Sequence, residues 1–140
     1  MTGMDAVSLR LHSGIPIIDV RAQMGEGAEQ VVHRTISALA EAGHFEVILN
    51  VCQAGALNRS LLPILVRAAA ALRGHCGHLT LVHPQASADV AQLAAQPGIR
   101  ITHSEIEALA RIKRMRLLSP GPICRAYLAE YGGTPCPYCR

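Results

Sequence analysis

The sequence predicts an α/β domain built on a mixed, mostly parallel sheet, and three observations lead to this prediction. Short apolar segments of strand length alternate with amphipathic segments of helical period along most of the chain. The first two strand segments are separated only by Ser13-Gly14, which predicts an antiparallel hairpin. Each later strand segment is separated from the next by a helical one, as in right-handed crossovers between parallel strands. The expected order is β-β-α-β-α-β-α-β-α, with the first strand antiparallel at the edge of the sheet.

The N-terminal elements follow from the spacing of apolar residues. Residues 7–12 alternate apolar and polar side chains, which predicts a strand with one solvated face. Residues 15–20 are more apolar and predict the second strand of the hairpin. From residue 28 the period becomes helical, and Gly43 is expected to end this helix. Residues 45–52 are nearly continuously apolar, which is typical of a central strand covered by other elements.

A second helix is expected between Ser60, as its N-cap, and the terminating Gly74. Pro63 would lie in the first turn, where its missing N–H costs little. The helical period places a stripe of apolar residues on the inner face of this helix: Leu61, Leu62, Leu65, Val66, Ala69 and Leu72.

The remaining elements are shorter. Residues 79–83 predict a buried strand, and Ser87 is expected to begin the helix that follows. Residues 99–102 predict a short strand after a Pro-Gly turn. Ser104 and Glu107 have the spacing of a capping box at the start of a last helix. The apolar positions of that helix are Ile106, Leu109 and Ala110.

The composition limits the classes of function. Half of the residues are hydrophobic but only 3% are aromatic, so the chain offers little surface for stacking nucleic-acid bases. The formal net charge of +3 is also too small to indicate a nucleic-acid partner. The longest mostly apolar stretch, Leu61 to Leu72, is too short to span a membrane and contains Arg67. We therefore expect a cytoplasmic protein without membrane insertion, whose five cysteines are reduced thiols or metal ligands.

In the order of its elements, the segment 7–110 resembles the STAS domain, the fold of the anti-sigma factor antagonists. Members of that family typically have an apolar strand ending in Asp or Asn, and eight residues later an Asp-Ser-Ser-Gly motif opens the next helix. In this chain the corresponding positions are Asn50 and Asn58. Gly77–Pro84 resembles the family's glycine-containing turn and strand, and Pro97–Ile101 resembles its short last strand. The resemblance implies a STAS-like fold.

The signature motif itself differs from the family's pattern. The chain has Asn58, Arg59, Ser60 and Leu61 where the family has Asp, Ser, Ser and Gly. In partner-switching members the first Ser is phosphorylated, which adds about −1.5 to −2 charge to the docking surface and expels the kinase partner. Arg59 cannot accept a phosphoryl group and places a fixed positive charge at that position. Ser60 matches the second Ser, and we expect no phosphorylation there.

The resemblance implies a regulatory, protein-binding module and not an enzyme. Its partner would be an anti-sigma factor or a related serine-kinase-like protein, docked through Asn58, Arg59, Ser60 and Leu61. From the residues alone, two interpretations of this loop stay open: a docking surface with Arg59 as anchor for an acidic partner, or a turn that caps a helix. A second role of the fold, as the STAS subunit of a lipid-transporting ABC system, also stays open. The oligomeric state is not determined, and a homodimer is among the alternatives.

The composition changes after residue 112. We expect residues 1–112 to form the STAS-like domain and residues 113–140 to form a basic linker with a cysteine-containing tail. The tail ends in Cys136-Pro-Tyr-Cys139, which matches the redox motif of glutaredoxins. Because a single residue follows the second cysteine in this sequence, we expect no helix there to lower the pKa of Cys136.

Zinc is the stronger chemical hypothesis for the tail. Cys136 and Cys139 have the spacing of one zinc knuckle, and Cys124 is a candidate third thiolate. His75 and His78, which flank a cysteine in a predicted turn, are either weak metal candidates or solvated turn residues. The sequence therefore leaves three alternatives for the tail: a zinc site, a small thiol-dependent activity, or free thiols with no cofactor.

Overall fold

The computed structural model describes residues 7–21, 26–51, 59–75, 77–82, 84 and 87–118. The elements are β1 (Val7–His12), β2 (Ile15–Val20), α1 (Glu26–Glu41), β3 (Glu46–Asn50), the 3₁₀ turn η2 (Arg59–Leu61), α2 (Leu62–Arg73), β4 (His78–Val82), α3 (Ala88–Ala94), β5 (Ile99–Thr102) and α4 (Glu105–Leu118). This is the order expected from the sequence, with a short 3₁₀ turn added before α2.

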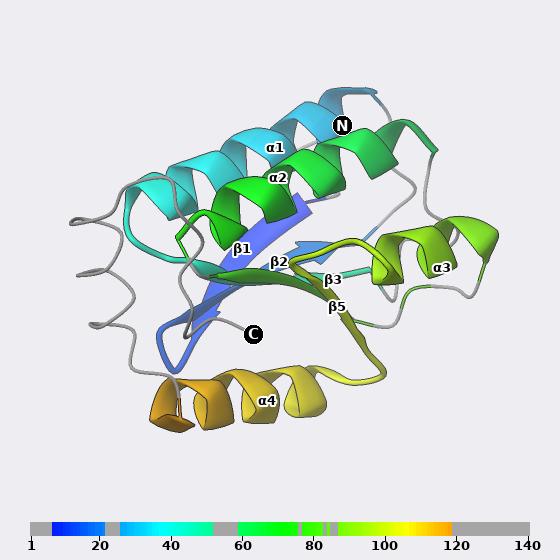
Figure 1. Cartoon of the computed structure of the whole chain (residues 1–140). Coiled ribbons are helices and arrows are strands. Elements are labelled where there is room, and N and C mark those ends of the chain that lie inside the picture. Colours follow the sequence, from blue (N-terminus) through cyan, green and yellow to red (C-terminus); the bar gives the residue numbers. More distant parts are fainter. Residues whose placement is uncertain are drawn as a thin grey trace.

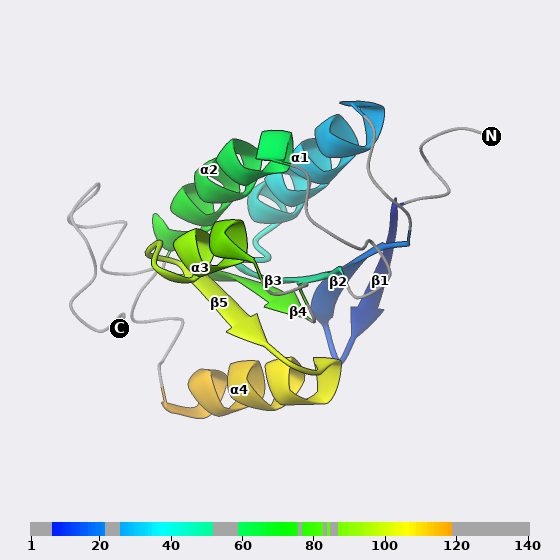
Figure 2. The same ribbon diagram turned by 90° about the vertical axis from the view of Figure 1, so that its right-hand side faces the viewer.

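The strands form one five-stranded sheet in the order β1-β2-β3-β4-β5. β1 and β2 pair antiparallel, and the other neighbours pair parallel, so the predicted mixed sheet is confirmed. Ser13 and Gly14, which connect β1 to β2, both have positive φ, as a two-residue type I′ hairpin turn requires. Figures 1 and 2 show α1 and α2 side by side over one face of the sheet and α4 over the opposite face.

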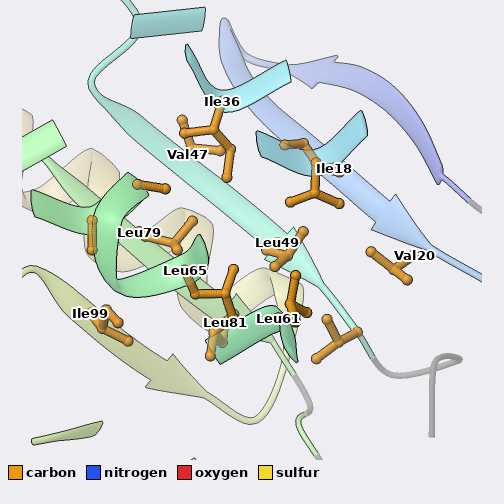
Figure 3. Packing of buried hydrophobic residues seen from close by; sticks show 14 of the residues in the cluster. Ile18, Val20, Ile36, Val47, Leu49, Leu61, Leu65, Leu79, Leu81 and Ile99 are labelled. Carbon is orange, nitrogen blue, oxygen red and sulfur yellow. The ribbon is translucent and has the colours of Figure 1, made fainter. Parts of the chain in front are cut away.

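Side chains on the central strands are buried on both faces of the sheet. The larger apolar cluster lies between the sheet and the pair α1 and α2, and Figure 3 shows its close packing. The smaller cluster packs α4 against the sheet. Consecutive residues alternate between the two: Ile18 and Leu49 belong to the larger cluster, whereas Ile17 and Ile48 belong to the smaller one. The near-continuous apolar sequence of these strands follows from this burial on both faces.

Two element boundaries differ from the sequence prediction. The α2 helix begins at Leu62, and its N-cap position is Leu61 without a side-chain cap, so Ser60 is not the N-cap. The reason is that the chain enters α2 through η2, which moves the start of the helix along the sequence. Pro63 lies in the first turn, as predicted.

The last helix also differs from its prediction. Ser104 accepts a hydrogen bond from the backbone N–H of Glu107 (3.1 Å), so the expected cap is present. Ile106, however, is 80% exposed, and the inward face is formed by Ala108, Leu109 and Ile112. The helix continues to Leu118, so the first residues of the predicted basic linker are helical. The division of the chain after residue 112 stays a prediction.

An ionic cluster joins the hairpin to α4. Arg10 on β1 donates to both carboxylate oxygens of Asp19 on β2 (2.7 and 3.1 Å) and also pairs with Glu105 at the start of α4. The hydrogen bonds that Arg10 donates to Asp19 are the main cause that raises the pKa of Arg10 above its ordinary value. The cluster therefore ties both strands of the hairpin to the start of α4.

The turn before β4 generates the first prediction. A Cβ at Gly77 would lie 1.8 Å from the backbone oxygen of Phe45, whereas a Cβ at Gly74 would come no closer than 3.4 Å to any neighbour. Gly77→Ala should therefore lower the free energy of unfolding by at least about 1–3 kcal/mol, because backbone must move to admit the methyl group. Gly74→Ala, the matched control, should change it by no more than about 0.5 kcal/mol. Urea denaturation measures both, and equal stabilities of the two variants would contradict the close approach.

Candidate partner-docking site

The carboxyl ends of the parallel strands and the first turns of three helices share one edge of the domain. The turn η2 and then α2 follow β3, α3 follows β4, and α4 follows β5. Because β3, β4 and β5 are parallel, these helix N-termini all lie beyond the same ends of the strands. In α/β sheets this edge is where side chains from separate loops come together.

Arg59 is a highly exposed charged group at this edge. It is the first residue of η2, and 88% of its side chain is accessible to solvent. Its Nε lies 3.7 Å from Oδ2 of Asp89, in the first turn of α3. An ion pair this long and this exposed contributes little to stability, so the guanidinium can exchange Asp89 for another carboxylate at small cost.

The outer surface of α2 continues the positive charge of Arg59. Pro63, Arg67 and Ala70 are exposed, and they project on the side of the helix opposite to the buried residues. We call Arg59, Pro63, Arg67 and Ala70 the α2 face. The helix sequence contains no acidic residue, so the face combines fixed positive charge with short side chains that lose little entropy when covered.

The four predicted partner-binding residues have different outcomes. Arg59 is exposed at the predicted place, between a strand and a helix. Asn58 lies outside the described residues, and of Ser60 the structure describes only its place in η2. Leu61 is fully buried in the larger cluster, and this corrects its predicted place in the interface. Its side chain closes the core beneath the start of α2 and does not face a partner.

A cluster of polar side chains at the opposite edge of the sheet was not predicted from the sequence. At the amino ends of β3 and β4, Nδ1 of His78 lies 2.7 Å from Oε1 of Glu46, and its Nε2 lies 3.2 Å from Nη2 of Arg100 on β5. Arg100 also contacts Met115 of α4, and burial is the main cause that lowers its pKa. Both ring nitrogens of His78 are therefore engaged, and the histidine is connected to α4 only through Arg100 in these contacts.

The sequence also predicted His75 and His78 as weak metal candidates. His75 stacks on Phe45, with ring centroids 4.4 Å apart, and so does not converge with His78. Within the described part of the chain, no group of three or more His, Cys, Asp or Glu side chains is placed to hold a metal ion. Cys124, Cys136 and Cys139 lie outside the described residues, so zinc binding by the tail stays a prediction.

The chain resembles known proteins in its structure but not detectably in its sequence. No protein-family model matches it, and no curated protein matches its sequence significantly. Solved structures do match. A protein of Thermotoga maritima assigned as an anti-sigma factor antagonist superposes with a TM-score of 0.68 and 12% identity, covering 80% of this chain and 98% of the other. The unphosphorylated anti-sigma factor antagonist SpoIIAA gives a TM-score of 0.66 and 17% identity, covering 77% and 98%.

The chain has the fold of the anti-sigma factor antagonists. The phosphorylated form of SpoIIAA, a cell fate determinant of Bacillus, also matches, with a TM-score of 0.63 and 19% identity over 76% of this chain and 99% of the other. The expected STAS-like fold is thereby confirmed. None of the helices in the described segments has the length and apolar character needed to cross a membrane.

The contrast between Leu61 and Arg59 generates the second prediction. Leu61→Ala should lower the free energy of unfolding by about 2–5 kcal/mol, because it leaves a cavity in the larger cluster. Arg59→Ala should change it by less than about 0.5 kcal/mol, because the side chain is exposed and its ion pair is weak. Chemical denaturation of both variants measures the difference. A Leu61→Ala variant as stable as the unmodified chain would contradict the core assignment.

Proposed function

We propose that the chain is a non-catalytic regulatory module that binds an anti-sigma factor through the α2 face. The observation that carries the proposal is Arg59, exposed at the junction of β3 and α2 in a fold shared with proteins described as anti-sigma factor antagonists. The charge of the α2 face supports an acidic partner surface.

The proposed mechanism is competition for one partner. A chain that occupies the anti-sigma factor removes it from its other ligand, by mass action and without any chemical step. We call the edge of the domain that holds Arg59 the docking edge. There, a carboxylate of the partner would take the place of Asp89 beside Arg59. The contact would gain from the desolvation of an Arg–carboxylate pair, which is stronger in an interface than in open solvent.

Regulation would differ from that of phosphorylated relatives. SpoIIAA has been solved in both a phosphorylated and an unphosphorylated form. In this chain Arg59 stands at the family's first Ser position and cannot be phosphorylated. We infer constitutive docking, controlled by the amounts of the competing partners or by another input.

Charge reversal at the docking edge is the third prediction. Arg59→Glu should weaken binding to the cognate anti-sigma factor at least about tenfold, or about 1.4 kcal/mol, because it opposes like charges at the interface. Arg73→Glu is the matched control. Arg73 is exposed at the far end of α2, and its substitution makes the same change in net charge. Calorimetric titration of the purified partner measures both affinities.

Three outcomes would count against the proposal. If the Arg59→Glu variant bound the partner with unchanged affinity, the α2 face would not be the interface. An equal loss of affinity in both variants would show that the effect comes from the net charge of the chain and not from Arg59. Recovery of a transporter ATPase in place of an anti-sigma factor would favour the ABC-system alternative.

The fourth prediction concerns Ser60. Incubation of the chain with ATP and the cognate kinase should add no phosphate at Ser60, because the neighbouring residue that the family phosphorylates is replaced by Arg59. Intact-mass and peptide mass spectrometry measure this directly, with a phosphorylatable antagonist from the same system as positive control. A phosphate on Ser60 would show that the switch has moved by one position.

A further inference from the structure

The outer edge of β1 is open in the described structure. β1 is the terminal strand of the sheet, and its six residues all pair with β2 in unbroken register. A regular edge strand without a bulge presents its outward N–H and C=O groups to any strand that can pair with them. In Figure 2 no described helix or strand lies outside β1.

The same strand exposes apolar side chains. Leu9 is 49% exposed and Leu11 is 62% exposed, and in the described segments Ile106 is the one other large hydrophobic residue that is so exposed. Leu9 and Leu11 share a sheet face with Val7, which is buried in the larger cluster. An added strand would therefore extend an existing apolar layer.

The usual protections of an edge strand are weak in β1. It contains no proline, and its one permanently charged side chain, Arg10, is drawn back over the sheet toward Asp19 and Glu105. The opposite edge strand, β5, has only four residues and exposes no large hydrophobic side chain. The two edges of the sheet therefore differ in their capacity to accept a partner.

We propose that the occupant of this edge is a second copy of the chain, paired antiparallel through β1 so that the two sheets become continuous. With the two-fold axis at Leu9, that residue faces Leu9 of the second copy, and each Leu11 faces a Val7. Residues on one face of an antiparallel pair meet directly in this way, and the contact is self-complementary, as a two-fold interface must be.

Charge complementarity selects the same arrangement. Arg10 then lies opposite Ser8 of the second copy, and Ser8 is the β2-paired neighbour of Asp19. The cluster of Arg10, Asp19 and Glu105 contains two carboxylates for one guanidinium, so it can accept another cation. A two-fold axis at Arg10 would instead oppose two like charges, which is destabilising.

The dimer would leave the proposed docking site accessible. The α2 helix packs over β4, whereas β1 is contacted by α1. Each dimer would therefore present two α2 faces directed away from the new strand pair. The inference does not depend on the proposed function, because it concerns only the association of the chain with itself.

Sedimentation velocity over a wide concentration range, in reducing agent, tests the proposal. The unmodified chain should pass reversibly from monomer to dimer. Leu9→Lys and Leu11→Lys should each raise the dissociation constant at least about tenfold. Ile106→Lys, which makes the same chemical change on α4, should not. A chain that stays monomeric at all concentrations, or a loss of dimer with Ile106→Lys alone, would overturn the proposal.

A cysteine introduced at the axis tests the register. Mild oxidation of Leu9→Cys should give a crosslink between the two copies of residue 9, identified by peptide mapping, because directly opposite Cβ atoms are close enough for a disulfide. Leu11→Cys, facing Val7, should not link to itself. Self-linkage at residue 11 without linkage at residue 9, in a preparation that sediments as a dimer, would contradict the pairing. Circular dichroism of each variant checks that the hairpin still folds.

Discussion

The burial of the central strands on both faces is the constraint from which the rest of the structure follows. Ile17 and Ile18 are consecutive residues of β2, yet both are fully buried, in clusters on opposite sides of the sheet. Each such side chain contributes about 1.5–3 kcal/mol when it is removed from water. The sheet therefore needs a helical layer on each face, and the crossover connections that provide these layers bring the N-termini of α2, α3 and α4 to one edge. The exposure of Arg59 at that edge is a consequence of this topology.

The two helical layers are held in different ways. The helices α1 and α2 are held on the sheet by the larger apolar cluster. The helix α4 contributes Ala108, Leu109 and Ile112 to the smaller one. Polar contacts lie on the α4 side at both ends of the helix: Arg10 pairs with Glu105 near its start, and Arg100 contacts Met115 farther along. Burial lowers the pKa of Arg100, but the charge of Glu46 opposes that shift. The polar groups thus supplement a layer that is short of apolar area.

The sequence predicted the elements well because periodicity depends on burial, which is local in pattern. It predicted less where neighbouring patterns overlap. Leu61 was consistent both with the inner stripe of α2 and with the docking loop, and only the 3₁₀ turn before the helix decides between them. Ile106 fitted the apolar period of the last helix, but Ala108, Leu109 and Ile112 form the inward face of α4, and Ile106 lies off that face and is exposed.

The polar contacts between side chains could not be predicted from the sequence, for a different reason. Asp89 lies beside Arg59, although thirty positions separate them in the chain, and His78 bridges Glu46 and Arg100 from three separate strands. No periodicity signals such pairs, because their spacing is set by strand order and register. The candidate site was thus predictable as a place in the fold and as one exposed residue, but not as a set of contacts.

In the proposed function, Arg59 stands at the position where the family has a phosphorylatable serine, and this has a consequence for how such a module would be regulated. A phosphate would change the charge of the docking edge by about −1.5 to −2 each time it is added or removed, whereas a guanidinium stays positive at every physiological pH. An interface anchored on that charge cannot be switched at this position. Its occupancy must then follow from the concentrations and affinities of competing ligands, and a paired β1 edge would add to this by joining two docking faces in one particle. Control through assembly would take the place of control through phosphorylation.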